Sequence, residues 1–519
     1  MSSPSRSQRA RRVPASHACD ACAARKIRCD RASPCRRCST LSIECTATRR
    51  RSKPGPKGPW AARRREARLA EDSWREAGDA ASNESIQSLS PASQDDGQPQ
   101  QPSAACSPDV SYRAVSTAAL ERYLGIFQLH LYPVWPVVDQ DELRSRLRNS
   151  GDWEAYMLAA AISAVTIAQL QLSPEEHYDL VGDGARMAAE AWRIRASLDY
   201  LEHPSISTLL SSFFLHIAAA NRREIRKAAF LLREAVTCAQ LLGLDQAVYY
   251  RALPRDESQL QLRVVWLLFV TERGHSTRFD FPRILQLDPN LPALEADENT
   301  AILSPFINLC RLFRNFSHAV DGDGSPRTHE TFAEMHARLR AAPESPHYSS
   351  DLQLADFKLT QQWMRVVLWK TSMYHVSLTA DAEGDDSLSL GFPNQVARRV
   401  VQDLDTFPVH IVEFHGLGME MKLFEIAMSL ADILLCLPSA LTSRESMRIG
   451  PRDVLGHLVQ FMAGFRGGGD RAKLQLLYTK TYGTGASVFS IHPTPRKDDG
   501  LPCRPLSSDP STSVKGIEW

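Results

Sequence analysis

Apolar side chains recur every three or four positions through most of this chain, which is the spacing of α-helices that bury one face. The first such stretch begins near Arg113 and ends before Pro133. Further helices are expected at 153–172, 182–200, 206–220, 227–242, 260–273, 304–319, 329–341, 350–378, 394–405, 419–437 and 452–465. Gly243 stands where the helix 227–242 needs a C-terminal cap. Alternating β-branched runs between hairpin turns are scarce, so the pattern predicts a large all-α domain of packed helical hairpins over 113–485.

The stretch 153–172 is the most apolar of these helices, but Ser163, Thr166 and Gln169 interrupt it. A helix that spans a bilayer needs about 20 predominantly apolar residues. No run in the chain reaches that length and purity. We therefore interpret 153–172 as a buried core helix and expect no membrane partner.

Outside this domain the helical pattern fades. Residues 79–112 are dominated by Ser, Gln, Asp, Ala and Pro and are expected to form a disordered tether, and residues 1–15 and 486–519 are expected to be disordered tails. Residues 49–78 are expected to form a basic linker with a short helix, in which Trp60, Ala67 and Trp74 are seven positions apart. The positions between them do not complete the apolar seam of a coiled coil, so a homodimer remains an open alternative.

Charge divides the chain in a similar way. The 519 residues carry a formal net charge of +1, yet residues 1–78 hold 20 Lys and Arg against 7 Asp and Glu, while the remainder holds 41 against 53. A basic head on an acidic body favours nucleic acid at one end only. The basic segment 49–60, rich in Pro and Gly, is expected to be extended and to follow a DNA backbone. Together with 63–65 it is expected to act as a nuclear-import signal.

Six of the eleven cysteines lie within positions 19–45, at Cys19, Cys22, Cys29, Cys35, Cys38 and Cys45. Two tetrahedral zinc ions need eight ligand positions, which six thiolates supply only if two of them bridge. Disulfides are the alternative, since six cysteines can pair in many ways in a small secreted domain. No apolar signal peptide precedes the cluster and the N-terminus is basic, so a reducing compartment and a binuclear zinc cluster are the better interpretation.

Motifs of enzymes are incomplete. His329 and Glu330 are followed by His336, which gives H-E-x5-H and not the spacing that places two histidines on one zinc. The glycines 467–469 lack the G-K-[ST] ending of a phosphate loop, so they predict a flexible turn. The nucleophile motif G-x-S-x-G is absent. The chain is therefore not expected to be an enzyme.

The cysteine pattern C-x2-C-x6-C-x5-C-x2-C-x6-C resembles the DNA-binding domain of fungal Zn2Cys6 transcription factors, here over residues 16–48. The resemblance implies a small zinc-stabilised α domain with two Zn2+ ions. It also implies that Cys19 and Cys35 bridge the two ions. Cys22 and Cys29 would then complete one site, and Cys38 and Cys45 the other.

The same resemblance implies a DNA interface on double-stranded DNA with CGG triplets. Lys26 is expected to donate to guanine N7 and O6, with Arg25 beside it. The remaining candidates are expected to contact phosphates, and they are Arg28, Arg36, Arg37 and Arg50. A solvated surface charge is the alternative for any single arginine. His17 is interpreted as a flanking residue, because six cysteines already satisfy two zinc ions.

Four phrases of the helical domain resemble the fungal-specific regulatory region that follows zinc clusters, and they lie at 131–139, 204–210, 231–244 and 265–273. They are most similar to regulators of starch and maltose use, a branch shared with regulators of biosynthetic gene clusters. The resemblance implies a regulatory or metabolite-sensing role for the domain. Within the last phrase, Glu272 and Arg273 are expected to form a structural ion pair.

These observations predict a nuclear, sequence-specific transcription factor that controls a pathway-specific gene set and recruits the transcription machinery. The domain is compact beside the longer starch regulators, which favours an activator of a secondary-metabolite gene cluster. Control of carbohydrate (starch or maltose) utilisation is the alternative. A zinc-containing helical interaction protein without sequence-specific DNA binding is the alternative from a different class of protein.

Overall fold

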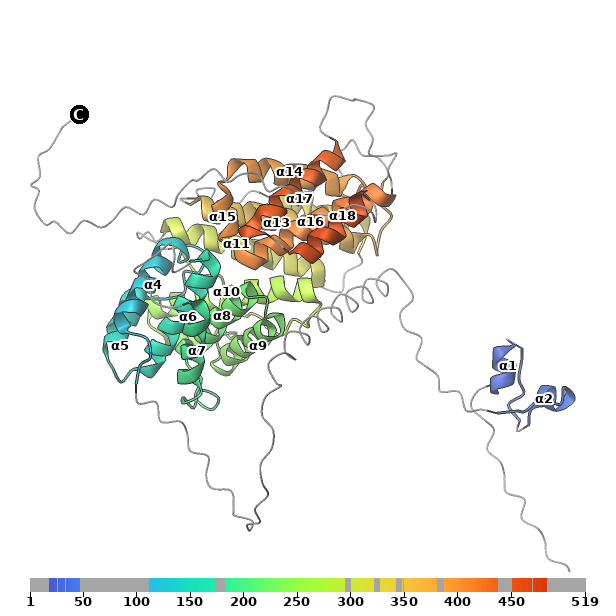
Figure 1. Ribbon diagram of the computed structural model, residues 1–519, viewed down its shortest axis with the longest axis horizontal. Helices are drawn as coiled ribbons and strands as arrows, with labels where there is room; N and C mark the ends of the chain where they lie inside the picture. Colours follow the sequence, from blue (N-terminus) through green and yellow to red (C-terminus); the bar gives the residue numbers. More distant parts are fainter. Residues whose placement is uncertain are drawn as a thin grey trace, which may run out of the picture. The chain divides into compact units, whose positions relative to one another are not determined.

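The structure is a computed structural model. It describes residues 18–25, 27–32, 34–46, 112–172, 183–294, 300–321, 327–341, 348, 350–379, 387–436, 450–468 and 470–482. The chain divides into two compact units, residues 1–103 and 104–519 (Figure 1). The predicted tails, the basic linker, the short helix at 60–77 and the tether up to residue 111 lie outside the described residues. So do His17, Lys26 and Arg50.

The first unit contains two short helices, α1 (Asp20–Ala24) and α2 (Arg36–Thr40), and a cysteine stands directly before each. The chain leaves both helices in the same way. The N–H of Ile27 donates to the carbonyl of Cys22 at 3.1 Å, and the N–H of Ile43 donates to that of Cys38 at 3.0 Å. Each C-x2-C pair therefore sits on one helical turn, and the two turns are built alike.

The second unit is helical throughout its described parts, with a single isolated bridge between Thr379 and Ser389 and no strand there, so the predicted fold class is confirmed. Its first elements are α4 (Thr117–His130), α5 (Gln140–Arg148), α6 (Trp153–Leu170), α7 (Gly184–Arg195), α8 (Ile206–Asn221), α9 (Ile225–Leu241), η2 (Tyr249–Ala252) and α10 (Arg255–Phe279). The others are α11 (Thr300–Asp321), α12 (His329–Arg340), α13 (Asp351–Ser372), α14 (Phe392–Thr406), α15 (Val409–Glu413), α16 (Gly416–Cys436), α17 (Pro451–Gly464), η3 (Phe465–Gly467) and α18 (Arg471–Tyr482).

Short polar side chains fix where several of these helices begin. Ser116, Asp152, Asp183 and Ser205 each accept a hydrogen bond from a backbone N–H in the first turn that follows, which satisfies a donor without a partner inside the helix. At the other end of α9, Gly243 has φ +80°, as its predicted place at a helix C-terminus requires. The helix predicted at 260–273 is longer than the pattern indicated, and three helices (α5, α15 and α18) were not predicted.

One continuous apolar core holds this unit together. α6 lies at the centre of its first half and packs against α4, α7 and α8. By length and composition α6 could cross a membrane, but 78% of it is buried inside the domain. It is therefore a core helix, as predicted, and the hydroxyls of Ser163 and Thr166 donate to carbonyls within the same helix.

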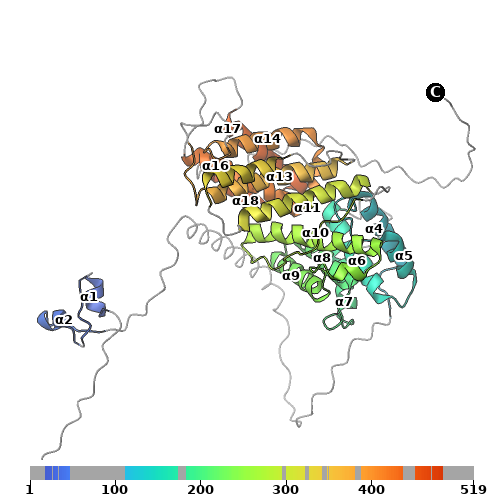
Figure 2. The same cartoon turned by 180° about the vertical axis from the view of Figure 1, so that it is seen from behind.

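The helices form two groups that lie side by side in both views (Figures 1 and 2). The first group is α4 to α10, coloured blue-green to light green, and the second is α11 to α18, coloured yellow to red. The groups meet where α10 packs against α11 and where α8 packs against α16. This boundary is the place of the pocket described below.

Candidate metal centre and nucleic-acid interface

The six cysteines of the first unit come together although they are spread over positions 19–45. The sulfur of Cys35 lies 3.7 Å from that of Cys19 and 3.6 Å from that of Cys22. The sulfur of Cys19 lies 3.6 Å from that of Cys38 and 3.9 Å from that of Cys29. A disulfide bond is about 2.0 Å long, so these sulfurs are too far apart to be bonded, and all six cysteines are free.

The distances fit metal ligation instead. Zn–S bonds of about 2.3 Å in a tetrahedron place neighbouring sulfurs about 3.8 Å apart. Two sets of four sulfurs lie within 4.8 Å of one another, and they are Cys19, Cys22, Cys29, Cys35 and Cys19, Cys35, Cys38, Cys45. The sets share Cys19 and Cys35. Two ions could therefore be held by six thiolates with two in common, and these residues fit a binuclear zinc cluster.

Backbone donors and burial shift the pKa values of these thiols in opposite directions. Backbone N–H groups donate to the sulfurs of Cys19 and Cys35 and lower the pKa of both thiols, with the N–H of Cys38 at 3.4 Å from the Cys35 sulfur. Burial raises the pKa of Cys22 to about 12. The thiolate is the form that binds metal, and a bound cation would overcome such a rise by holding the thiolate directly.

Four of the predicted DNA-contacting residues are described, and all four are exposed: Arg25, Arg28, Arg36 and Arg37. Arg25 follows the last residue of α1, whereas Arg36 and Arg37 lie in the first turn of α2. None of the four has a carboxylate partner within the described part of this unit. Their charges are therefore available to an anionic partner.

In the helical domain, the predicted pair of Glu272 and Arg273 is confirmed as an ion pair with an N–O distance of 2.7 Å, and both side chains are buried. Glu272 also accepts from Arg233 at 2.8 Å and from the N–H of Ile284 at 2.9 Å. These contacts tie α9 and α10 to the segment that follows α10. The pair is part of the scaffold.

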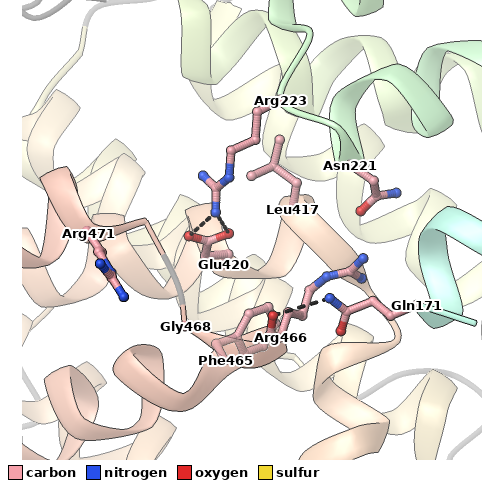
Figure 3. A pocket seen from close by; sticks show the side chains of 9 residues that line it. All are labelled: Gln171, Asn221, Arg223, Leu417, Glu420, Phe465, Arg466, Gly468 and Arg471. Carbon is pink, nitrogen blue, oxygen red and sulfur yellow. Dashed lines mark hydrogen bonds and ion pairs between the residues drawn. The ribbon is translucent and has the colours of Figure 1, made fainter. Parts of the chain in front are cut away.

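The same domain contains a polar pocket that the sequence did not reveal (Figure 3). Its walls come from segments as far apart as Gln171 and Arg471. No local motif joins them, and the only sequence signal nearby is the glycine run at 467–469, which was predicted to be a turn.

Comparisons with known protein families match a segment of each unit. The family described as "Fungal Zn(2)-Cys(6) binuclear cluster domain" matches residues 17–54, and the "Fungal specific transcription factor domain" matches residues 124–332. A probable sucrose utilization protein of Candida albicans is 27% identical over 440 residues, which cover 81% of this chain and 80% of the relative. Two maltose fermentation regulatory proteins of Saccharomyces cerevisiae are 24% and 25% identical, over 81% of this chain and 84% and 85% of their own lengths.

Proposed function

This chain is a fungal Zn2Cys6 transcription factor with a fungal-specific transcription factor domain, and we propose that it controls genes for the use of sugars such as maltose or sucrose. The family consists of DNA-binding regulators that hold two zinc ions and not of enzymes. The observation that carries the proposal is the similarity to sugar-utilisation regulators along 81% of the chain.

The proposed pathway, sugar utilisation, was the alternative in the sequence analysis. The main expectation there was a secondary-metabolite gene cluster. The preference for a secondary-metabolite gene cluster depended on a helical domain that looked compact beside starch regulators. The sugar regulators named above are matched over 80% to 85% of their own lengths, so compactness does not separate this chain from them. No comparison supports the secondary-metabolite expectation.

We propose that Cys19 and Cys35 bridge the two zinc ions, that Cys22 and Cys29 complete one site, and that Cys38 and Cys45 complete the other. One observation supports this assignment: Cys19 and Cys35 belong to both sets of four sulfurs.

The DNA interface is proposed on the basic side chains around this cluster. Six thiolates and two zinc ions together carry a formal charge of minus two, which opposes approach to phosphate. The exposed arginines offset that charge. We propose that Lys26 and Arg25 read the guanines of a CGG triplet, and that Arg28, Arg36, Arg37 and Arg50 contact phosphates. The basic segment from 49 to 65 would supply nuclear import.

Deletion of the gene tests the proposed pathway. Mutant and parent strains are transferred from glucose to maltose or sucrose, and transcripts are measured before and after transfer. We expect the genes for sugar transporters and glycosidases to be induced in the parent and not in the mutant, with normal growth on glucose as the control. Unchanged sugar genes together with altered transcripts of a biosynthetic gene cluster would contradict the proposal.

A further inference from the structure

The short helix α2 of the zinc unit carries a serine beside two exposed arginines. Ser39 follows Arg36 by three positions and Arg37 by two, and all three residues are exposed. The hydroxyl of Ser39 has no hydrogen-bond partner within the described part of the chain, whereas the hydroxyl of Thr40 donates to the carbonyl of Arg36 at 2.7 Å. Ser39 therefore supplies the hydroxyl of α2 that is free to react.

The sequence that leads to this hydroxyl is Arg-Arg-Cys-Ser, a pattern selected by protein kinases with an acidic substrate groove. Carboxylates of such a groove bind arginine side chains two and three residues before the acceptor through charge-assisted hydrogen bonds. Among the described serines and threonines, only Ser39 has arginine at both positions. Elsewhere in the sequence only Ser52 does, after Arg49 and Arg50, and it lies outside the described residues.

A kinase binds its acceptor segment in an extended form, so the end of α2 has to open. Few bonds hold that end. The N–H of Ser39 donates to the carbonyl of Cys35 at 3.0 Å, and the N–H of Leu41 donates to that of Arg37 at 3.2 Å. A helix of five residues gains little stability from its own hydrogen bonds, and Leu41 is 52% exposed. The segment after Cys38 can therefore open without exposing a hydrophobic core.

We propose that Ser39 is phosphorylated by a protein kinase that selects arginine-rich segments, and that the phosphate weakens DNA binding. The Ser39 oxygen attacks the γ-phosphorus of ATP, the bond from this phosphorus to the ADP oxygen breaks, and ADP and the hydroxyl proton are released. The phosphoserine carries a charge of about −1.5 to −2 at pH 7. This inference rests on the proposed function, in which the zinc unit binds DNA.

A phosphate at this position opposes DNA binding in two ways. Residues three apart on a helix have Cβ atoms about 5–6 Å apart, so the phosphate can pair with the guanidinium of Arg36, one of the proposed DNA contacts. The charge of the phosphate also adds to the formal minus two of the zinc-loaded cluster and repels the DNA backbone. Both effects are electrostatic, so they should change the salt dependence of binding.

Kinase treatment of the full-length, zinc-loaded protein tests the modification itself. The probe is ATP with the catalytic subunit of cAMP-dependent protein kinase, which selects this arginine pattern. Mass spectrometry of the peptides should find phosphate on Ser39, and Ser52 is the internal comparison. Arg36→Ala should slow phosphorylation of Ser39 about tenfold and leave that of Ser52 unchanged. Absence of phosphate from Ser39, whether or not Ser52 carries it, would overturn the inference.

The effect on DNA is measured in Ser52→Ala protein, so that of the two serines with this pattern only Ser39 can be modified. The phosphorylated protein should bind a duplex with CGG triplets about ten- to hundredfold more weakly than the unmodified protein, the loss expected for one charge-assisted hydrogen bond. Its affinity should also fall less steeply with salt, with the logarithmic slope smaller by about 1. Kinase-treated protein with both Ser39→Ala and Ser52→Ala is the control and should bind like untreated protein. Equal affinities of the modified and unmodified proteins would overturn the inference.

Two substitutions of Ser39 separate charge from shape. Aspartate and asparagine are nearly equal in size and differ by one negative charge. Ser39→Asp should weaken DNA binding, by less than the phosphate does, and Ser39→Asn should bind as the parent does. Native mass spectrometry should find two zinc ions in both variants, which shows that the unit is folded. Equal DNA binding by the two variants would contradict the electrostatic effect.

The unmodified protein separates this inference from the proposed function. If unmodified protein shows no preference for CGG triplets, the proposed DNA interface is wrong, whatever the phosphate does. If it prefers them and phosphate on Ser39 leaves the binding unchanged, the inference is wrong and the proposed function stands.

Discussion

The zinc cluster and the helical domain are stable for opposite reasons. In the described part of the first unit the buried apolar residues are Cys19, Cys22, Cys35 and Cys38, so almost nothing besides sulfur is buried there. The helical domain buries a continuous core of aliphatic and aromatic side chains. A unit of that small size cannot bury enough apolar surface to fold alone, and metal binding supplies the missing free energy. One chain therefore combines a unit whose folding depends on metal with a unit whose folding depends on hydrophobic burial.

Removal of zinc should produce the largest difference in stability between the two units. Structural zinc contributes roughly 10–16 kcal/mol in small zinc domains, so a chelator should unfold the first unit completely and abolish DNA binding. Within its described residues the helical domain gathers no set of metal ligands, so it should keep its protection from hydrogen exchange. Hydrogen exchange of the full chain with and without chelator measures both units in one experiment. Loss of protection in α6 on chelation would contradict this independence.

A cysteine that belongs to both ligand sets and a cysteine that belongs to one set should differ in their effect on zinc binding. Cys19→Ala removes a sulfur shared by both sets of ligands, so both zinc ions should be lost. Cys22→Ala removes a sulfur from one set only, and at least part of the second zinc should remain. Native mass spectrometry counts the ions that each variant retains. Equal metal loss in the two variants would refute the bridging assignment.

Substitution of a core aromatic residue should have the converse effect, because it should destabilise the helical domain and leave the zinc cluster intact. Phe214 is 0% exposed and packs edge-on against Phe127 at 5.6 Å between ring centroids. Phe214→Ala should destabilise the helical domain by about 3–5 kcal/mol and leave the zinc content unchanged. Phe230, which is 64% exposed, gives the matched control Phe230→Ala, with a change within about 0.5 kcal/mol. Denaturant unfolding followed by circular dichroism measures both, and equal losses would show that the burial does not decide stability.

A smaller effect is expected where the two helical groups meet. Gly416 has φ +63°, and a Cβ there would lie 2.6 Å from the side-chain oxygen of Asn221. Gly416→Ala should therefore destabilise the domain by about 1–3 kcal/mol. Gly418 has nothing within 4 Å of its Cβ position, and Gly418→Ala inside α16 should be neutral or stabilising. Equal thermal midpoints for the two variants would contradict the close approach.

More of the zinc unit than of the helical domain could be predicted from the sequence, and the reason is physical. Ligand spacing is local, so the cysteine pattern led directly to the cluster. Helices with wide apolar faces were also found, whereas α5 was missed because it buries only Gln140, Leu143 and Leu147 among charged residues. α18 was missed because it follows a run of glycines.

The pocket could not be predicted from local pattern at all. The side chain of Gln169 donates to the carbonyl of Phe414 at 2.6 Å, and that of Gln171 to the carbonyl of Arg466 at 3.2 Å. Contacts over such separations are set by the packing of the whole domain, and no spacing in the sequence encodes them. The target pathway is not encoded in local physical chemistry either, and there the relatives favour the alternative over the first expectation.

The central claim is that the zinc cluster directs this protein to DNA by sequence. Genome-wide binding of the tagged protein, of Lys26→Ala and of Arg37→Ala tests it most directly. We predict sites rich in CGG triplets upstream of sugar-utilisation genes, which lose their sequence preference in Lys26→Ala, by about 1–3 kcal/mol of discrimination, and weaken uniformly in Arg37→Ala. Scattered binding that Lys26→Ala leaves unchanged would contradict the claim and favour a zinc-containing interaction protein.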